Sequence, residues 1–127
     1  MESKTVLIVE DDPPSLDIFE TILRHGGYQV VSARTGAECL ERARALLPDA
    51  VVLDIGLPDG LAFGVLGELS DDPATEAIPL IVCTVHVFEQ DQVRARRAGA
   101  DVFLVKPVEP RDLLAAVDRL LKASEAA

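Results

Sequence analysis

The stretch Ala50-Val-Val-Leu-Asp-Ile-Gly-Leu-Pro58 decides how this chain folds. Its first four residues are apolar without interruption, and a carboxylate, Asp54, follows them directly. A continuous apolar run of this length is typical of a strand that is buried on both faces of a parallel sheet. Reactive groups in such sheets gather beyond the carboxyl ends of the strands, so we expect Asp54 to lie at a functional edge.

Three more apolar runs and a short strand-like segment at 28–32 occur in the chain, and helical patterns separate them. The predicted strands are Thr5–Val9, 28–32, Ala50–Leu53, 79–83 and Val102–Val105, and the predicted helices are 14–25, a helix that Thr35 opens and Pro48 closes, a weaker helix around 63–69, 88–98 and 110–122. This alternation predicts an α/β fold, a doubly wound five-stranded parallel sheet with helices on both faces. With five strands, the order 2-1-3-4-5 is the natural one and places the first and third strands side by side.

Local signals predict how two of the helices begin and end. Thr35-Gly-Ala-Glu38 has the spacing of a capping box, in which the hydroxyl and the carboxylate each accept a hydrogen bond from a backbone amide. Leu46 or Leu47 is expected on the inner stripe of the same helix. The tail beyond Lys122 is expected to be frayed.

Composition limits the class of protein. With 127 residues, we expect one domain, residues 1–127, with a core over residues 5–122. The net charge of -10 repels a polyanion, so direct binding to nucleic acid is not expected. No apolar run approaches the roughly 18 residues of a membrane span and no secretory signal is visible, so a cytoplasmic protein without membrane contact is expected. Cys39 and Cys83 lack the spacing of a metal or redox motif and are expected to be small buried groups.

Four of the five predicted strands are followed by charged or hydroxyl side chains. These are Glu10 and Asp11, Asp54, Thr84, and Lys106. Carboxylates that are held close together raise one another's pKa unless a cation joins them. Mg²⁺ prefers oxygen ligands, so it suits a site made of Glu10, Asp11 and Asp54, and the Gly56 carbonyl could complete its shell.

A carboxylate in this setting can attack phosphorus. The product is an aspartyl phosphate, and the transfer needs positioning and charge neutralisation more than proton chemistry. Asp54 fits the nucleophile, while Lys106 and the Thr84 hydroxyl could each hold a phosphoryl oxygen. Each residue alone is more often a cap or a surface group, but their combination favours a function. Lys106-Pro107 follows a buried strand, and a cis bond there would aim the lysine inward.

The chain resembles the receiver domains of two-component response regulators over nearly its whole length. The matching segments are Val6-Leu-Ile-Val-Glu-Asp-Asp12, Val51-Val-Leu-Asp-Ile-Gly-Leu-Pro58, Ile81-Val-Cys-Thr84, Ala98-Gly-Ala-Asp-Val-Phe103 and Val105-Lys-Pro107. The resemblance implies the flavodoxin-like strand order, magnesium bound near Glu10 and Asp11, and Asp54 as the phosphoacceptor. It also implies that a histidine kinase or a histidine phosphotransfer protein donates the phosphoryl group, and that Thr84 and Phe103 form the switch.

By the same resemblance, the protein is a switch rather than an enzyme. Its output face would be built from residues 88–98, 102–105 and 110–122, and would bind a downstream protein or form a homodimer. Two positions depart from the family pattern, because Val85 replaces the usual small residue after the threonine and Leu61-Ala62 replaces the usual Asp-Gly. The sequence names neither the kinase nor the output partner.

Three other functions fit the sequence less well. A receiver that works without phosphorylation finds support only in Val85. A magnesium-dependent phosphohydrolase of the haloacid dehalogenase type needs a second acid where Gly56 stands. A flavin-binding module needs a phosphate loop rich in glycine and hydroxyl groups after the first strand, and acidic residues and prolines stand there instead.

Overall fold

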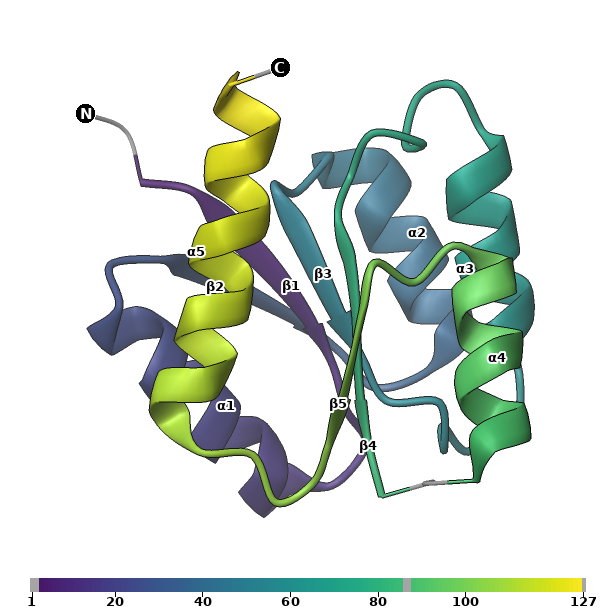
Figure 1. Cartoon of the computed structure of the whole chain (residues 1–127), viewed down its shortest axis with the longest axis horizontal. Coiled ribbons are helices and arrows are strands. Elements are labelled where there is room, and N and C mark those ends of the chain that lie inside the picture. The colour runs from purple at the N-terminus through teal and green to yellow at the C-terminus, as the bar shows by residue number, and fades with distance from the viewer. Residues whose placement is uncertain (1–2, 86–87, 127) are drawn as a thin grey trace.

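The computed structural model describes residues 3–85 and 88–126 (Figure 1). Its elements are, in order, β1 (Thr5–Val9), α1 (Pro13–His25), β2 (Gln29–Ala33), α2 (Gly36–Leu46), β3 (Ala50–Leu53), α3 (Ala62–Asp71), β4 (Leu80–Thr84), α4 (Glu89–Ala98), β5 (Val102–Val105) and α5 (Pro110–Ala126). Every predicted strand and helix is present. The alternation of strand and helix that the apolar runs indicated is therefore confirmed.

The five strands form one parallel sheet in the order β2-β1-β3-β4-β5. This is the predicted order, with β1 and β3 adjacent and Val9 paired with Leu53. Helices α1 and α5 cover one face of the sheet and α2, α3 and α4 cover the other (Figure 1). The residues that follow β1 and β3 consequently emerge side by side at the same edge.

The sheet divides the hydrophobic core into two halves. Successive side chains of a strand point to opposite faces, so Leu7 and Val9 pack with α2, α3 and α4, while Val6 and Ile8 pack with α1 and α5. All four of these side chains are buried. The central strands have cover on both faces, which is why their sequences are continuously apolar.

The ends of helix α2 only partly follow the prediction. The Thr35 hydroxyl accepts from the Glu38 amide at 3.1 Å, as in a capping box, but the Glu38 carboxylate accepts from the Arg34 amide instead of the Thr35 amide. The helix ends at Leu46, and Leu47 caps it in the left-handed conformation with φ 48°. Leu46 and Leu47 are each 54% exposed, so the prediction that one of them lies on the inner stripe was wrong.

The last helix is longer than expected. Helix α5 continues to Ala126, beyond the expected end of the helix at Lys122. Alanine, glutamate and lysine have high helix propensity, and these residue types dominate the last turn. In the described residues, no helix is long and apolar enough to cross a membrane.

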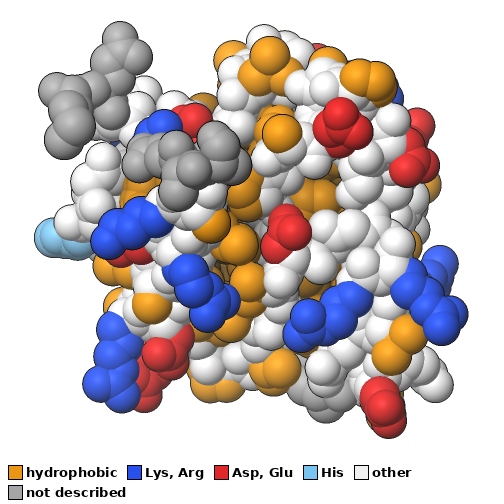
Figure 2. All heavy atoms as spheres, turned by 45° about the horizontal axis from the view of Figure 1, so that its top comes forward, with side chains coloured by type: hydrophobic (Ala, Val, Ile, Leu, Met, Phe, Trp, Pro, Cys, Tyr) orange, Lys and Arg blue, Asp and Glu red, His pale blue; other side chains and the backbone are white. Residues whose placement is uncertain are grey.

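The surface mixes charged and apolar side chains. Figure 2 shows the end of the molecule at which the strands begin, where acidic and basic side chains are interspersed with hydrophobic ones. Helix α4 is the most polar helix, and Ala95 is its one buried residue. Cys39 and Cys83 are both buried, as expected, and burial raises the pKa of each thiol to about 12.

Candidate phosphoryl-acceptor site

Four strands deliver the predicted site residues to one edge of the sheet. Glu10 follows β1, Asp54 follows β3, Thr84 ends β4 and Lys106 follows β5. The backbone continues the ladder beyond the strands, since the Asp54 amide donates to the Val9 carbonyl at 3.1 Å and the Lys106 amide donates to the Thr84 carbonyl at 2.9 Å. These bonds fix where each side chain leaves the sheet.

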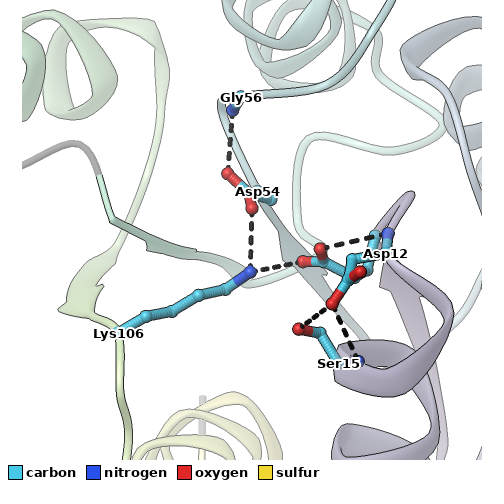
Figure 3. Close-up of polar contacts among 6 residues, drawn as sticks. Asp12, Ser15, Asp54, Gly56 and Lys106 are labelled. Carbon is cyan, nitrogen blue, oxygen red and sulfur yellow. Dashed lines mark hydrogen bonds and ion pairs between the residues drawn. The ribbon is translucent and has the colours of Figure 1, made fainter.

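Lys106 joins the two buried carboxylates. Its Nζ lies 2.6 Å from Glu10 Oε2 and 2.9 Å from Asp54 Oδ2. Figure 3 shows the lysine reaching across the edge toward Asp54. The exposed fractions of the Lys106, Glu10 and Asp54 side chains are 14%, 4% and 10%, so water screens these contacts weakly. The charge that joins these acids is therefore supplied by Lys106, which was expected to hold a phosphoryl oxygen and not to stand in the place of the predicted Mg²⁺.

Asp54 is held by three different donors. Burial raises the pKa of Asp54, but hydrogen bonds from Lys106, the Gly56 amide and the Thr84 hydroxyl together outweigh it and leave the pKa below its usual value. The Gly56 amide lies 2.8 Å from Oδ1, on the opposite side of the carboxylate from the lysine (Figure 3). Asp54 is therefore ionised at neutral pH, as a nucleophile must be.

The pKa values of Glu10 and Lys106 also follow from these contacts. Burial raises the pKa of Glu10, and the charge of Asp54 adds to this, while Lys106 opposes it without cancelling it. For Lys106, burial lowers the pKa, but hydrogen bonds and charge attraction from Asp54 and Glu10 raise it overall. The lysine stays protonated and supplies the positive charge of the site.

The remaining two acids after β1 behave differently from Glu10. Asp11 is exposed, and no hydrogen bond or ion pair to another described residue holds its carboxylate. Asp12 is the N-cap of α1, where Oδ2 accepts from the Ser15 amide at 3.2 Å and from the Ser15 hydroxyl at 2.7 Å (Figure 3). This cap was not predicted, although an aspartate before Pro13 at the start of a helix is a known signal.

The side chains present fit magnesium in chemistry but are not gathered around a metal. Glu10, Asp11, Asp54 and the Gly56 carbonyl all offer the hard oxygen atoms that Mg²⁺ prefers. Among residues 3–85 and 88–126, however, no group of three acidic, histidine or cysteine side chains is arranged to hold a metal ion. Lys106 occupies the position between Glu10 and Asp54 that a shared cation would take.

The residues around the lysine form a groove of about 410 Å³. Its lining includes Ser15, Ile18, Phe19, Val85 and Pro107. The Phe19 ring lies 5.5 Å from Lys106 Nζ, a contact that the sequence analysis did not foresee. Val85 is 63% exposed and stands beside the lysine, and the Lys106-Pro107 bond is cis, as expected.

Phe103 lies apart from the charged cluster. It belongs to β5, is partly buried, and packs against the half of the core that α2, α3 and α4 cover. It pairs with Val82 of β4, close in sequence to Thr84. The predicted switch residues thus occupy adjacent strands.

The chain matches a family model described as the response regulator receiver domain over residues 6–118. It is 33% identical over 106 residues to the polar-differentiation response regulator DivK of Brucella ovis. This alignment covers 84% of this chain and 86% of that protein. Its structure resembles that of a CheY-like receiver domain protein from Methanospirillum hungatei, with a TM-score of 0.92, 32% identity and coverage of 98% of each chain.

A second solved structure bears on the metal. It is the receiver domain of the sensor histidine kinase PA1611 from Pseudomonas aeruginosa, which has a magnesium ion coordinated in its active site cleft. The identity is 25%, the TM-score is 0.88, and the alignment covers 95% of this chain and 99% of that one.

Proposed function

Because this chain belongs to the response regulator receiver domains, we propose that Asp54 is its phosphoacceptor and that phosphorylation changes a protein-binding surface. One observation carries the proposal. The Asp54 carboxylate is ionised, nearly buried, and held between the Lys106 ammonium, the Thr84 hydroxyl and the Gly56 amide. Among the described carboxylates, only Asp54 is both buried and held by an ammonium, a hydroxyl and a backbone amide together.

The residues divide the work of the transfer between them. An Asp54 oxygen attacks phosphorus, the bond from phosphorus to the donor's nitrogen breaks, and the leaving imidazole keeps the electron pair of that bond. Lys106, already 2.9 Å from Asp54 Oδ2, neutralises charge on the phosphoryl oxygens, and the Thr84 hydroxyl donates to one of them. Both donors already contact Asp54 before the reaction, so the transfer begins with positive charge and a hydroxyl donor beside the nucleophile.

Magnesium is the proposed cofactor. When bound, it would neutralise phosphoryl charge, and Asp11, Glu10, Asp54 and the Gly56 carbonyl would hold it. Asp11 is exposed and free to turn inward, and Lys106 would have to exchange its contact with the acids for one with the phosphoryl group. The metal of the related P. aeruginosa receiver supports this assignment.

The proposed donor is a histidine kinase or a histidine phosphotransfer protein, and the output leaves through Thr84 and Phe103. A dianion on Asp54 gives the Thr84 hydroxyl a stronger acceptor, which draws it inward and makes room for the Phe103 ring. The face made of α4, β5 and α5 then changes and binds a downstream protein or a second copy of the chain. The complete cluster of Glu10, Asp54 and Lys106 argues against a receiver that never accepts a phosphoryl group.

The test is uptake of a phosphoryl group from a small acyl phosphate with Mg²⁺. The native protein should gain the mass of one phosphoryl group and lose it in hydroxylamine, because an acyl phosphate is cleaved by that nucleophile. Asp54→Asn should gain nothing, since an amide lacks the nucleophilic oxygen but keeps the shape. Asp49→Asn is the matched control, because Asp49 accepts from the Thr5 amide at 2.7 Å at the opposite edge of the sheet. Uptake by Asp54→Asn equal to that of the native protein would contradict the assignment.

A further inference from the structure

Asp59 ties the loop between β3 and α3 to the beginning of α2. Its Oδ1 accepts from the Gly36 amide at 3.1 Å and from the Leu61 amide at 3.3 Å, and its Oδ2 accepts from the Ala37 amide at 3.1 Å. Gly36 and Ala37 are the first residues of α2, whose amides have no acceptor within the helix. One carboxylate therefore binds the start of α2 and its own loop together.

The loop and the helix approach so closely that no side chain fits between them. A β-carbon on Gly36 would lie 2.9 Å from Leu61 Cβ and 3.2 Å from Asp59 Oδ1. Gly36 is buried and lies in the first turn of α2. The steric limit at Gly36 is therefore a second sign, independent of the hydrogen bonds, that the loop packs closely against the start of α2.

Helix α2 does not need Asp59 as its cap. Thr35 is already the N-cap and accepts from the Glu38 amide at 3.1 Å. The loop, in contrast, leads into a helix without such a cap, because α3 begins after Leu61 with no side-chain cap hydrogen bond. We conclude that the contact mainly holds the loop in place, where the usual Asp-Gly of the family is absent.

The anchored loop contains the peptide group that faces Asp54. The Gly56 amide donates to Asp54 Oδ1 at 2.8 Å. Directly after Gly56, Leu57 is buried in the core, and its carbonyl accepts from the Gly60 amide at 3.1 Å. Gly56 is therefore held between the strand end at Asp54 and a turn that Asp59 fastens to α2.

The charge of Asp59 strengthens this anchor. Slight burial raises the pKa of Asp59, but the amides of Ala37, Gly36 and Leu61 outweigh it and lower the pKa overall. The carboxylate is consequently ionised at neutral pH, and hydrogen bonds to an ionised acceptor are stronger than neutral ones.

We propose that Asp59 is a positioning residue for phosphoryl uptake, which acts by holding the loop on α2 and so fixing the Gly56 peptide group. That group orients Asp54 through its amide and offers its carbonyl to the proposed magnesium. The inference rests on the proposed function of Asp54. Loosening the loop should lower the rate of uptake and the affinity for magnesium, and not only the stability of the fold.

Two variants disturb the contact from opposite sides. Asp59→Asn replaces an acceptor oxygen with an amide group that faces backbone donors, and Gly36→Ala pushes the loop away while keeping the carboxylate. Asp49→Asn again serves as the control, since it weakens a similar bond from a carboxylate to a backbone amide far from Asp54. The readouts are the uptake rate as a function of acyl phosphate concentration, the Mg²⁺ affinity by calorimetry, and the Gly56 amide resonance by NMR.

We expect both variants to lower the maximal uptake rate by about tenfold, because small displacements of reacting groups are costly. Both should weaken Mg²⁺ binding and shift the Gly56 resonance, whereas Asp49→Asn should change none of the three. Native rates, native Mg²⁺ affinity and an unmoved Gly56 resonance in Asp59→Asn would overturn the inference. If that variant does not fold, Gly36→Ala decides by the same criteria. Absence of uptake by the native protein would instead refute the proposed function, while the Gly56 resonance and Mg²⁺ affinity would still judge the role of Asp59.

Discussion

Replacement of Lys106 by methionine removes the cation that contacts the two buried acids of the site, the only one that does so among the described residues. At an effective dielectric constant of about 20, unit charges at the observed separations of 2.6 and 2.9 Å attract by about 6 kcal/mol each. Loss of water around three charged groups offsets most of this attraction. Removing one partner of a buried ion pair nevertheless costs ~3–5 kcal/mol, because the other charge stays buried without compensation.

We expect Lys106→Met to lose about 3 kcal/mol of unfolding free energy at pH 7, the lower end of that range. Methionine keeps much of the apolar stem, and Glu10 can relieve the repulsion by binding a proton. Urea unfolding followed by circular dichroism measures the loss, since the chain has no tryptophan. Arg111→Met is the matched control: the Arg111 side chain is 84% exposed and its pair with Glu109 at 3.2 Å should contribute little.

The pH dependence of the variant carries the sharper test. In the native protein Lys106 lowers the pKa of Glu10, while burial and the charge of Asp54 raise it. The pKa of Glu10 is already raised overall with the lysine present, and without the lysine nothing of comparable size opposes burial, so Glu10 in the folded variant binds a proton even more readily than in the native protein. The stability of Lys106→Met should then rise as the pH falls from 7 toward the ordinary glutamate value of about 4.3.

In the native protein, the contribution of Asp54 to stability should change with pH in the opposite direction and fall on acidification. The pKa of Asp54 is lowered by folding, so its contribution to stability is present above the unfolded value of about 3.9 and is lost as the pH falls through the folded value. The difference between native protein and variant should therefore shrink on acidification. A difference that is the same at pH 7 and pH 5, or a variant as stable as the native protein at pH 7, would refute this account of the cluster.

Three further predictions concern single side chains at the same edge. Asp11→Ala should weaken Mg²⁺ binding by about tenfold or more without lowering the stability of the metal-free protein, as calorimetry and thermal unfolding would show; lost metal-free stability would mark Asp11 as structural. Val85→Ala should speed uptake from a small donor, and because Val85 is 63% exposed its stability should change by less than about 0.5 kcal/mol; equal rates would show that the valine does not obstruct Asp54. A beryllofluoride mimic should shift the NMR signals of Phe103 in the native protein but not in Thr84→Ala, and equal shifts in both would break the proposed link.

The architecture and most of the site could be predicted because strand burial leaves a strong mark on sequence. The central strands are mostly apolar, and the first charged residue after such a strand, such as Asp54 after β3, marks the edge. Parallel order then brings the ends of neighbouring strands together without any knowledge of side-chain geometry. That placement explains why Lys106 lies near both acids, but it does not predict the distances from Lys106 Nζ to the Glu10 and Asp54 oxygens.

Local features with weak sequence signals could not be predicted. Leu46 and Leu47 look like core residues, yet the helix ends before Leu47 and leaves both exposed, since helical periodicity does not report where a helix stops. Asp59 looks like an ordinary turn residue, because its partners on α2 are distant in sequence. The capping by Asp12 was visible in principle, but a run of three acids hides which one caps.

Because of the Lys106 contacts, the proposed phosphoryl-acceptor site is complete only when the whole sheet has formed. Lys106 is separated from Glu10 by 96 positions and from Asp54 by 52, and it arrives on the strand that follows all the others in the chain. A chain still being synthesised, or one that has lost β5 and α5 by local unfolding, would carry two acids without their cation. Such incomplete molecules would lack the arrangement that receives the phosphoryl group. If Asp54 is the phosphoacceptor as proposed, phosphoryl uptake would then be confined to copies that have finished folding.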